Sequence, residues 1–202
     1  MKKILTSILL GLASLLGAAA EEVVEVSATN IPLLYEAKAE MPTPMERIAE
    51  AISADYRTLT DEFSKHEYLE KIKPSIKRRI KEAGETQSFF VTVGTHLGEY
   101  DFDRKAFPTG FDAGSFIPFN NYAVYFSNTE AVRYVEVPLE EAKKASSALK
   151  GSRQCTIVFT GILEKCGEKE FNYSLYKITY LKAKRVSIRL KDSTIEFTKE
   201  IP

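Results

Sequence analysis

Two histidines and a run of alternating carboxylates are the side chains of this sequence best suited to chemistry. His66 lies in a charged helical stretch where a solvated side chain is the ordinary role, so His96 is the better candidate for a general base. A turn near Gly98 would bring Asp101 or Asp103 back toward His96, as the acid/base pair of a hydrolase requires. The sequence has no metalloprotease, nucleophile-elbow or phosphate-loop motif to support that hypothesis.

The same carboxylates raise the question of a metal site. Glu99, Asp101 and Asp103 alternate, which on an extended chain points three carboxylates to one side, and oxygen ligands suit a hard cation such as calcium. An EF-hand loop that began at Asp101 would need an oxygen ligand at its fifth position, where Lys105 stands. We therefore predict a solvated strand end with local ion pairs to Arg104, and neither a metal nor a cofactor.

Aromatic side chains gather between residues 107 and 126, among glycines, prolines and asparagines. Alternation places Tyr122, Val124 and Phe126 together on the inward face of a strand. A Gly/Pro-rich loop with phenylalanines can instead form the rim of a groove for a peptide, a sugar chain or a partner protein. The predicted binding residues are Phe107, Phe111, Phe116, Phe119 and Tyr122.

A basic stretch is the second candidate surface. Leu69, Ile72, Ile76 and Ile80 form the buried stripe of an amphipathic helix there. The basic residues beside this stripe are Lys73, Lys77, Arg78, Arg79 and Lys81. They would suit anionic lipid headgroups, lipopolysaccharide or an acidic protein, unless they are only the solvated face of the helix.

The two cysteines, Cys155 and Cys166, leave two structures open. If residues 155–166 form one straight strand, the cysteines lie roughly 36 Å apart at about 3.3 Å per residue and cannot bridge. If Thr160 and Gly161 form a two-residue hairpin turn, the cysteines face each other and can bridge. We predict the disulfide, because two free thiols are unusual in an oxidising compartment.

The first twenty residues indicate such a compartment. Lys2 and Lys3 precede an apolar run over residues 4–16, and an Ala-x-Ala site ends at Ala20. The run is shorter than the roughly 20 residues that cross a bilayer, so we expect a cleaved signal peptide rather than a transmembrane anchor. The predicted location is the periplasm or the medium outside the cell.

The charge balance narrows the class of partner. The chain has 28 basic and 28 acidic residues, and loss of Lys2 and Lys3 leaves a formal charge of −2. A near-neutral protein has no general attraction to nucleic acid, so we predict no nucleic-acid partner. A protein, a peptide or a cell-envelope polymer remains as the expected ligand.

Hydrophobic periodicity divides the chain into parts. These are a signal peptide (1–20), an extended N-terminal arm or short edge strand (21–42), a helical subdomain (43–84), and a β-rich OB-like domain (85–202) with one helix (138–149). Thr43 and Glu46 predict a capping box at the start of the first helix. Pro74 predicts a kink in the second helix, and Gly84 its end.

Strands are predicted where the hydrophobic residues begin to recur at every second position. They are predicted at 88–98, 121–127, 132–137, 154–163, 173–190 and 195–197. In the predicted strand at 173–190, the alternation of apolar and polar residues shifts between Leu181 and Lys184, which indicates a bulge or bend. This order of elements resembles an OB-type barrel, and a helix-on-sheet arrangement explains it nearly as well. The predicted fold is α+β, with N-terminal helices packed on a mostly antiparallel OB-like β-barrel or curved sheet.

The segment Gly98–Pro108, GEYDFDRKAFP, is similar to exported bacterial proteins of unknown function. Such a resemblance implies no activity. Our first hypothesis is therefore an exported, non-catalytic module that binds through the 107–120 loop. An exported hydrolase that uses His96 is the alternative, and a purely structural envelope protein is a third possibility.

Overall fold

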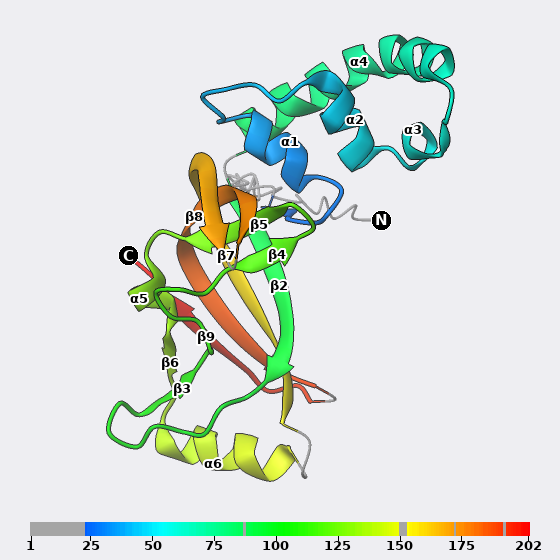
Figure 1. Ribbon diagram of the computed structural model, residues 1–202. Helices are drawn as coiled ribbons and strands as arrows, with labels where there is room; N and C mark the ends of the chain where they lie inside the picture. The colour runs from blue at the N-terminus through cyan, green and yellow to red at the C-terminus, as the bar shows by residue number, and fades with distance from the viewer. Residues whose placement is uncertain (1–22, 87, 150–152, 172, 192) are drawn as a thin grey trace, which may run out of the picture.

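The computed structural model describes residues 23–86, 88–149, 153–171, 173–191 and 193–202. A mixed sheet curves into a half-barrel, and a layer of helices lies across one end of it (Figure 1). The helices are α1 (Ile31–Glu36), α2 (Met45–Ile52), α3 (Ala54–Thr58), α4 (Glu62–Glu85), α5 (Thr129–Val132) and α6 (Leu139–Ala148). The strands are β1 (Val23–Glu25), β2 (Ser88–His96), β3 (Ala106–Pro108), β4 (Ile117–Phe119), β5 (Tyr122–Phe126), β6 (Tyr134–Glu136), β7 (Gln154–Phe171), β8 (Ser174–Leu190) and β9 (Glu196–Glu200).

The predicted fold class is confirmed. The main sheet has the order β1-β2-β7-β8-β5-β4, and β9 pairs with the second half of β8. Most neighbours are antiparallel, while β1 runs parallel to β2 and β5 runs parallel to β8. A separate pair, β3 and β6, lies with α6 at the end of the half-barrel that faces away from the other helices (Figure 1).

The long hairpin of β7 and β8 forms the centre of the sheet. Its ladder shifts register between Thr160 and Gly161, where Lys184 is the extra residue of β8, and again between Leu163 and Lys165. The first shift falls within the segment where the sequence predicted a bulge, so that prediction is confirmed. Asn128 satisfies the backbone beside the bulge, because its side chain accepts from the Ala183 amide and donates to the Ala183 carbonyl, each at 2.9 Å.

The predicted hairpin turn at Thr160 and Gly161 is wrong. β7 continues unbroken to Phe171, so Cys155 and Cys166 lie on one strand and both thiols are free. The predicted disulfide is therefore also wrong, since residues eleven positions apart along one strand cannot reach each other. A glycine is needed at position 161 for another reason. A Cβ there would collide with the backbone of Lys182 and Ala183 on β8.

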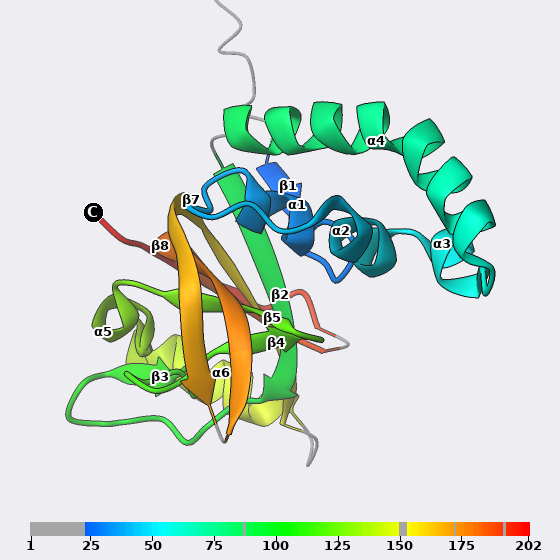
Figure 2. The same cartoon turned by 45° about the horizontal axis from the view of Figure 1, so that its top comes forward.

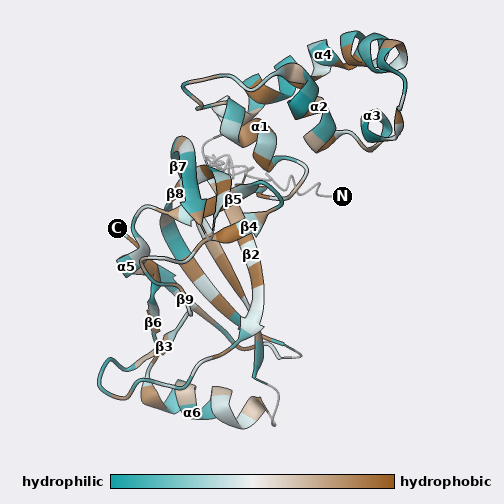
Figure 3. Cartoon of the chain, in the orientation of Figure 1, coloured by the Kyte–Doolittle hydropathy of each residue, from teal (hydrophilic) through white to brown (hydrophobic). Residues whose placement is uncertain are grey.

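Aromatic and branched side chains fill the inside of the half-barrel. Phe89, Phe126 and Phe159 are fully buried, and the rings of Phe126 and Phe159 have centroids 4.6 Å apart. Figure 3 shows many hydrophobic residues in the strands that enclose this core, whereas α4 is largely hydrophilic. Ile157 and Ile188 continue the same core along β7 and β8.

The predicted extended arm is only partly right. Its first residues form the edge strand β1, but α1 follows, with Ile31 and Leu34 buried in the main core. Pro32, which the sequence analysis took as a sign of extended chain, stands in the first helical turn, where its missing N–H costs nothing. One and a half turns are too short to show a helical period.

The helical layer has a small core of its own. Leu33 of α1, Ile48 of α2, Tyr56 of α3, and Leu69 and Ile76 of α4 are buried together. As predicted, Pro74 lies inside α4, and Figure 2 shows this helix bent near its middle.

The start of α2 and the end of α4 differ from the sequence predictions. The predicted capping box is absent, because Pro44 is the N-cap of α2 and the Thr43 side chain bonds Glu36 instead. At the other end of the layer, α4 continues one residue past Gly84 to Glu85.

The described residues of the β-rich part form two helices rather than one. α6 is the helix predicted at 138–149, and its predicted end at Gly151 lies outside the described residues. The four-residue helix α5 was not predicted, and it replaces the start of the strand expected at 132–137, which shortens to β6. No helix in the described part of the chain is long and apolar enough to cross a membrane.

Candidate functional site

The basic stretch predicted on α4 is mostly a solvated helix face. Lys73 pairs with Glu70 at 2.8 Å, and Arg78 and Lys81 each pair with a glutamate four residues on at 3.7 Å. Exposed pairs of this spacing add little to stability, but they reduce the local charge. Lys77 is exposed.

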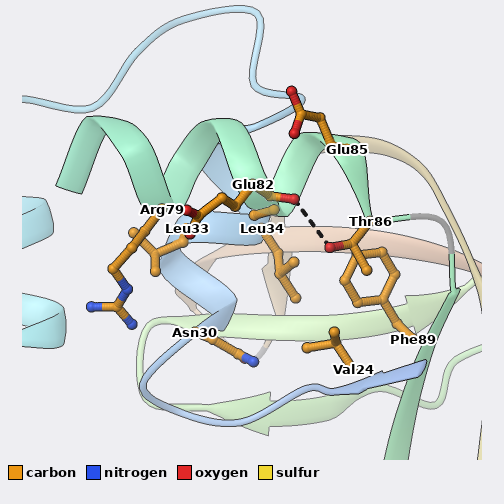
Figure 4. A pocket seen from close by; sticks show the side chains of 10 residues that line it. Val24, Asn30, Leu33, Leu34, Arg79, Glu82, Glu85, Thr86 and Phe89 are labelled. Carbon is orange, nitrogen blue, oxygen red and sulfur yellow. Dashed lines mark hydrogen bonds between the residues drawn. The ribbon is translucent and has the colours of Figure 1, made fainter. Parts of the chain in front are cut away.

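Arg79 differs from these basic residues. It is half-buried, no ion pair is found for it in the described part of the chain, and it faces a hollow beneath the helix. This hollow, the α4 groove, has a volume of about 670 Å³. Figure 4 shows α4 as its roof, β1 below it and α1 behind it. The apolar side chains that line the α4 groove are Val24, Leu33, Leu34, Ala83 and Phe89. They come from β1, α1, α4 and β2, so segments far apart in the sequence build one apolar lining.

The polar rim of the α4 groove is largely occupied by internal hydrogen bonds. The Thr86 hydroxyl donates to the Glu82 carbonyl at 3.0 Å, as Figure 4 shows. The Asn30 amide group accepts from the Ser27 N–H at 2.8 Å and donates to the Glu25 carbonyl. Glu82 and Glu85 also line the groove, and their carboxylates pair with Arg78 and Lys81 at 3.7 Å. The Arg79 guanidinium points away from the apolar side chains, toward the open end of the groove (Figure 4).

The strand that borders the α4 groove is an edge strand. β1 pairs only with β2 among the described strands, in parallel register from Val23 opposite Ser88 to Glu25 opposite Phe90. Edge strands present unpaired N–H and C=O groups on their outer side, and these groups can bond an extended chain. The Glu25 carbonyl already accepts from Asn30, so only the remaining outer groups of β1 can bond a ligand. The groove therefore offers an apolar surface, a cation and a short strand edge, with Glu82 and Glu85 also in its lining.

The histidine and the aspartates predicted as an acid/base pair do not form one. His96 ends β2 with its side chain exposed, opposite Gln154 of β7, and no carboxylate pairs with it in the described part of the chain. Asp101 is occupied in its own turn, where its carboxylate accepts from the Arg104 N–H at 2.9 Å and the Arg104 guanidinium at 2.8 Å. These bonds hold the pKa of Asp101 below its usual range. Asp103 is exposed, and the hydrolase prediction loses its geometric support.

Carboxylates do not gather into a metal centre here either. Within the described ranges, no three histidine, cysteine, aspartate or glutamate side chains lie close enough to share an ion. Glu99 is exposed, and the bonds between Asp101 and Arg104 provide the local ion pair that the sequence predicted.

Most residues of the predicted aromatic rim pack against the core. Phe107 and Tyr122 are buried in the core, and Phe111 packs edge-on against Phe159 at a centroid distance of 4.7 Å. Phe119 is partly buried against the same core. Phe107 belongs to the short strand β3, Phe119 to β4 and Tyr122 to β5. Only Phe116 finds its partners elsewhere, on the β7–β8 hairpin.

A second hollow lies between the helical layer and the β7–β8 hairpin, with a volume of about 750 Å³. Thr43 and Lys177 in its lining belong to a buried polar link with Glu36 that the sequence did not reveal. Glu36 is 3 % exposed, accepts from the Thr43 N–H at 2.8 Å and lies 3.8 Å from the Lys177 ammonium, which also donates to the Thr43 hydroxyl. The same ammonium lies 5.0 Å above the Tyr35 ring and 5.8 Å from that of Tyr122. This arrangement fixes α1 on the sheet, and its polar groups are satisfied internally.

The geometry defines an α+β half-barrel with a helical layer and a groove at their junction. Comparison with known families places a domain of unknown function, DUF4852, at residues 48–146, from α2 to α6. A search of curated proteins and a search of solved structures each found no match. The DUF4852 segment includes Arg79, Ala83 and Phe89 of the α4 groove, whereas Val24 and the α1 residues precede it.

Proposed function

We propose that this protein is a non-catalytic binding module and that the α4 groove holds a peptide or a segment of a partner protein. The α4 groove carries the proposal, because it combines an apolar lining with one half-buried cation that has no ion-pair partner among the described residues. Binding sites are concave and mostly apolar, with a few polar groups that fix the orientation of the ligand.

The groove suits an extended segment with an apolar side chain and an acidic group. One buried leucine or isoleucine side chain would contribute about 1.5–3 kcal/mol, and a hydrogen bond to the Arg79 guanidinium about 1.5–3 kcal/mol. Main-chain bonds to the outer edge of β1 would add affinity without selecting a sequence. The two quantified terms sum to about 3–6 kcal/mol, which is less than the roughly 8.2 kcal/mol of a micromolar complex. Since the entropy of association also opposes binding, we expect a short peptide to bind in the millimolar range or more weakly.

Selection from a random peptide library displayed on phage tests this proposal. The wild-type protein should enrich peptides that share an apolar residue near an acidic one. Binding should be lost in Ala83→Trp, which fills the groove, and in Arg79→Glu, which reverses the charge at a half-buried position. The control is Ala148→Trp on the exposed surface of α6. Failure to enrich any peptide, or binding by both groove variants equal to that of the wild type, would refute the proposal.

We also propose that the chain is exported and cleaved after Ala20. The support is the order of its first residues, with two lysines, an apolar run and an Ala-x-Ala site. Intact mass of the protein purified from its source tests this. A mass that begins at Glu21 is expected, and a mass that retains Met1–Ala20 would contradict the proposal.

A further inference from the structure

Five aromatic rings meet on the outer side of the sheet near the end of the β7–β8 hairpin. We name this surface the aromatic face, formed by Phe116, Tyr125, Phe171, Tyr176 and Tyr180. Phe116 stacks on Phe171 with centroids 4.1 Å apart and lies 5.3 Å from Tyr176, while Tyr125 meets Tyr180 at 5.6 Å. All five side chains are half-buried, so each ring keeps part of its surface in solvent.

Strand register explains why these residues share a face. Lys169 of β7 stands opposite Tyr176 of β8, and Lys165 stands opposite Tyr180, which is in turn opposite Tyr125 of β5. Glu164 is the extra residue at the second register shift. The side chains of Cys166 and Lys177, on the other face of the same strands, point to α1.

The charge on the aromatic face is positive. Lys165 lies 5.0 Å above the Tyr180 ring, and Lys169 lies 4.7 Å from the Tyr125 ring and 4.8 Å from the Phe171 ring. Lys182 belongs to the same side of the sheet. No ion pair is found for these three lysines in the described residues.

The acidic residues of this part of the hairpin lie elsewhere. Glu168 and Glu170 alternate onto the opposite face, and Glu164 occupies the bulge. The lysine ammonium groups of the aromatic face thus contact only aromatic rings and solvent, which leaves them available to an anionic ligand.

We propose that the aromatic face binds an acidic polysaccharide, such as a chain of uronic acids. The flat rings would pack against the C–H faces of sugar rings. Lys165 and Lys169 lie over the rings in the free protein, so each would turn from its ring to a sugar carboxylate on binding. The hydroxyls of Tyr176 and Tyr180, which make no hydrogen bond in the described part of the chain, suit sugar hydroxyls. This ligand class and this surface are separate from the peptide and the α4 groove.

Single-stranded nucleic acid also combines anionic groups with faces that stack on aromatic rings. The chain as a whole is not basic, with 28 positive and 28 negative residues. Nucleic-acid affinity comes largely from phosphate neutralisation by a protein that carries excess positive charge. A chain of uronic acids is a polyanion too, so the charge balance does not separate the two ligands. The signal-peptide pattern of the first twenty residues favours the polysaccharide, because an exported protein meets envelope polymers rather than nucleic acid.

Isothermal titration calorimetry with soluble polygalacturonate fragments, in about 0.15 M salt, tests the proposal. Dextran fragments serve as the neutral control. We expect binding to polygalacturonate only, weakened about tenfold or more in Lys165→Gln/Lys169→Gln, because two charge-assisted contacts are lost. The matched control is Lys71→Gln/Lys77→Gln, which removes the same charge from exposed positions of α4 and should bind as the wild type does.

A ring variant separates stacking from simple charge attraction. Tyr176→Ala leaves the net charge unchanged and should weaken binding about fivefold or more. Equal losses in both lysine pairs, no effect of Tyr176→Ala, or no binding at all would overturn the proposal. Binding of oligo(dT) without binding of polygalacturonate would overturn it in favour of nucleic acid. The groove variant Ala83→Trp should bind polygalacturonate normally, so this test does not depend on the peptide proposal.

Discussion

Replacement of Gly161 by alanine tests the packing of the central hairpin. A Cβ at this position would lie 2.9 Å from the Lys182 carbonyl carbon and 3.0 Å from the Ala183 Cα, and closer still to the Lys182 carbonyl oxygen. All three atoms are backbone, so no side chain can rotate away and β8 itself must move. Overpacking of this kind costs about 1–3 kcal/mol, and we expect a value near the upper limit.

Urea unfolding followed by circular dichroism measures that cost. For a slope of about 2–3 kcal/mol per molar urea, the midpoint of Gly161→Ala should fall by about 1 M. The matched control is Gly94→Ala on β2, where an added Cβ has no atom within 4 Å. That control should be as stable as the wild type or more stable by about 0.4–1 kcal/mol, because alanine restricts the unfolded chain. If Gly161→Ala unfolded at the same urea concentration as Gly94→Ala, the described contact between β7 and β8 would be refuted.

Two further predictions concern the contact between the helical layer and the sheet. Lys177→Met removes the cation that pairs with the buried Glu36 carboxylate, and it should lower the free energy of unfolding by about 2–3 kcal/mol. If the thermal midpoint of this variant were unchanged, the polar link would not stabilise the contact between α1 and the sheet. Burial raises the pKa of Cys166, Tyr35 and Tyr122 to about 12 each, whereas the unfolded chain loses these protons near 9 for the thiol and 10 for the phenols. As the pH rises, the unfolded chain loses these protons before the folded protein does, so the free energy of unfolding should be at its full value below pH 9 and fall progressively toward pH 12. The fall should be smaller in Tyr122→Phe. A thermal midpoint that stays constant from pH 8 to 12 would contradict this. For the same reason, Cys166 should react slowly with iodoacetamide at pH 8 and rapidly in urea, and a rapid reaction in the folded protein would show an accessible thiolate.

Long periodic segments of the sequence predicted their structure well. The apolar stripe of Leu69, Ile72, Ile76 and Ile80 predicted α4, and the alternation of Phe89 and Val91 predicted β2, because one buried face imposes a period on the sequence. The slip in β8 predicted the bulge for the same reason. An extra residue interrupts the inside–outside alternation wherever one side is core.

The second half of β7 could not be predicted from periodicity. Residues 164–171 read EKCGEKEF, and charged side chains occupy both faces because this part of the hairpin has solvent on one side and a polar hollow on the other. Figure 3 shows the upper part of the hairpin as hydrophilic. Without a hydrophobic pattern, Gly161 resembled a turn residue, although the structure requires glycine there for the close approach of β8.

The candidate sites escaped prediction for two different physical reasons. The α4 groove joins residues 24–34 with residues 79–89, and no local pattern records which distant segments share a cavity. Tyr176 and Tyr180 were visible in the sequence as alternating apolar positions, but the register places them on the outer side of the sheet. Of the predicted site residues, Phe116 and Arg79 gain a role in the proposals, and each lies where a loop or helix meets another segment.

The connectivity of the sheet has a consequence for how the chain folds. β7 and β8 are neighbours in sequence and can pair as a local hairpin, whereas β5 joins β8 across more than fifty residues, from Tyr122 opposite Lys177. β1 joins β2 across an even longer separation, from Val23 opposite Ser88. Long loops close late because their entropy is lost before any contact offsets it. We therefore expect the hairpin to form first as a template, and the strands that pair across long separations, β5, β2 and the β1 strand beside the α4 groove, to join it later.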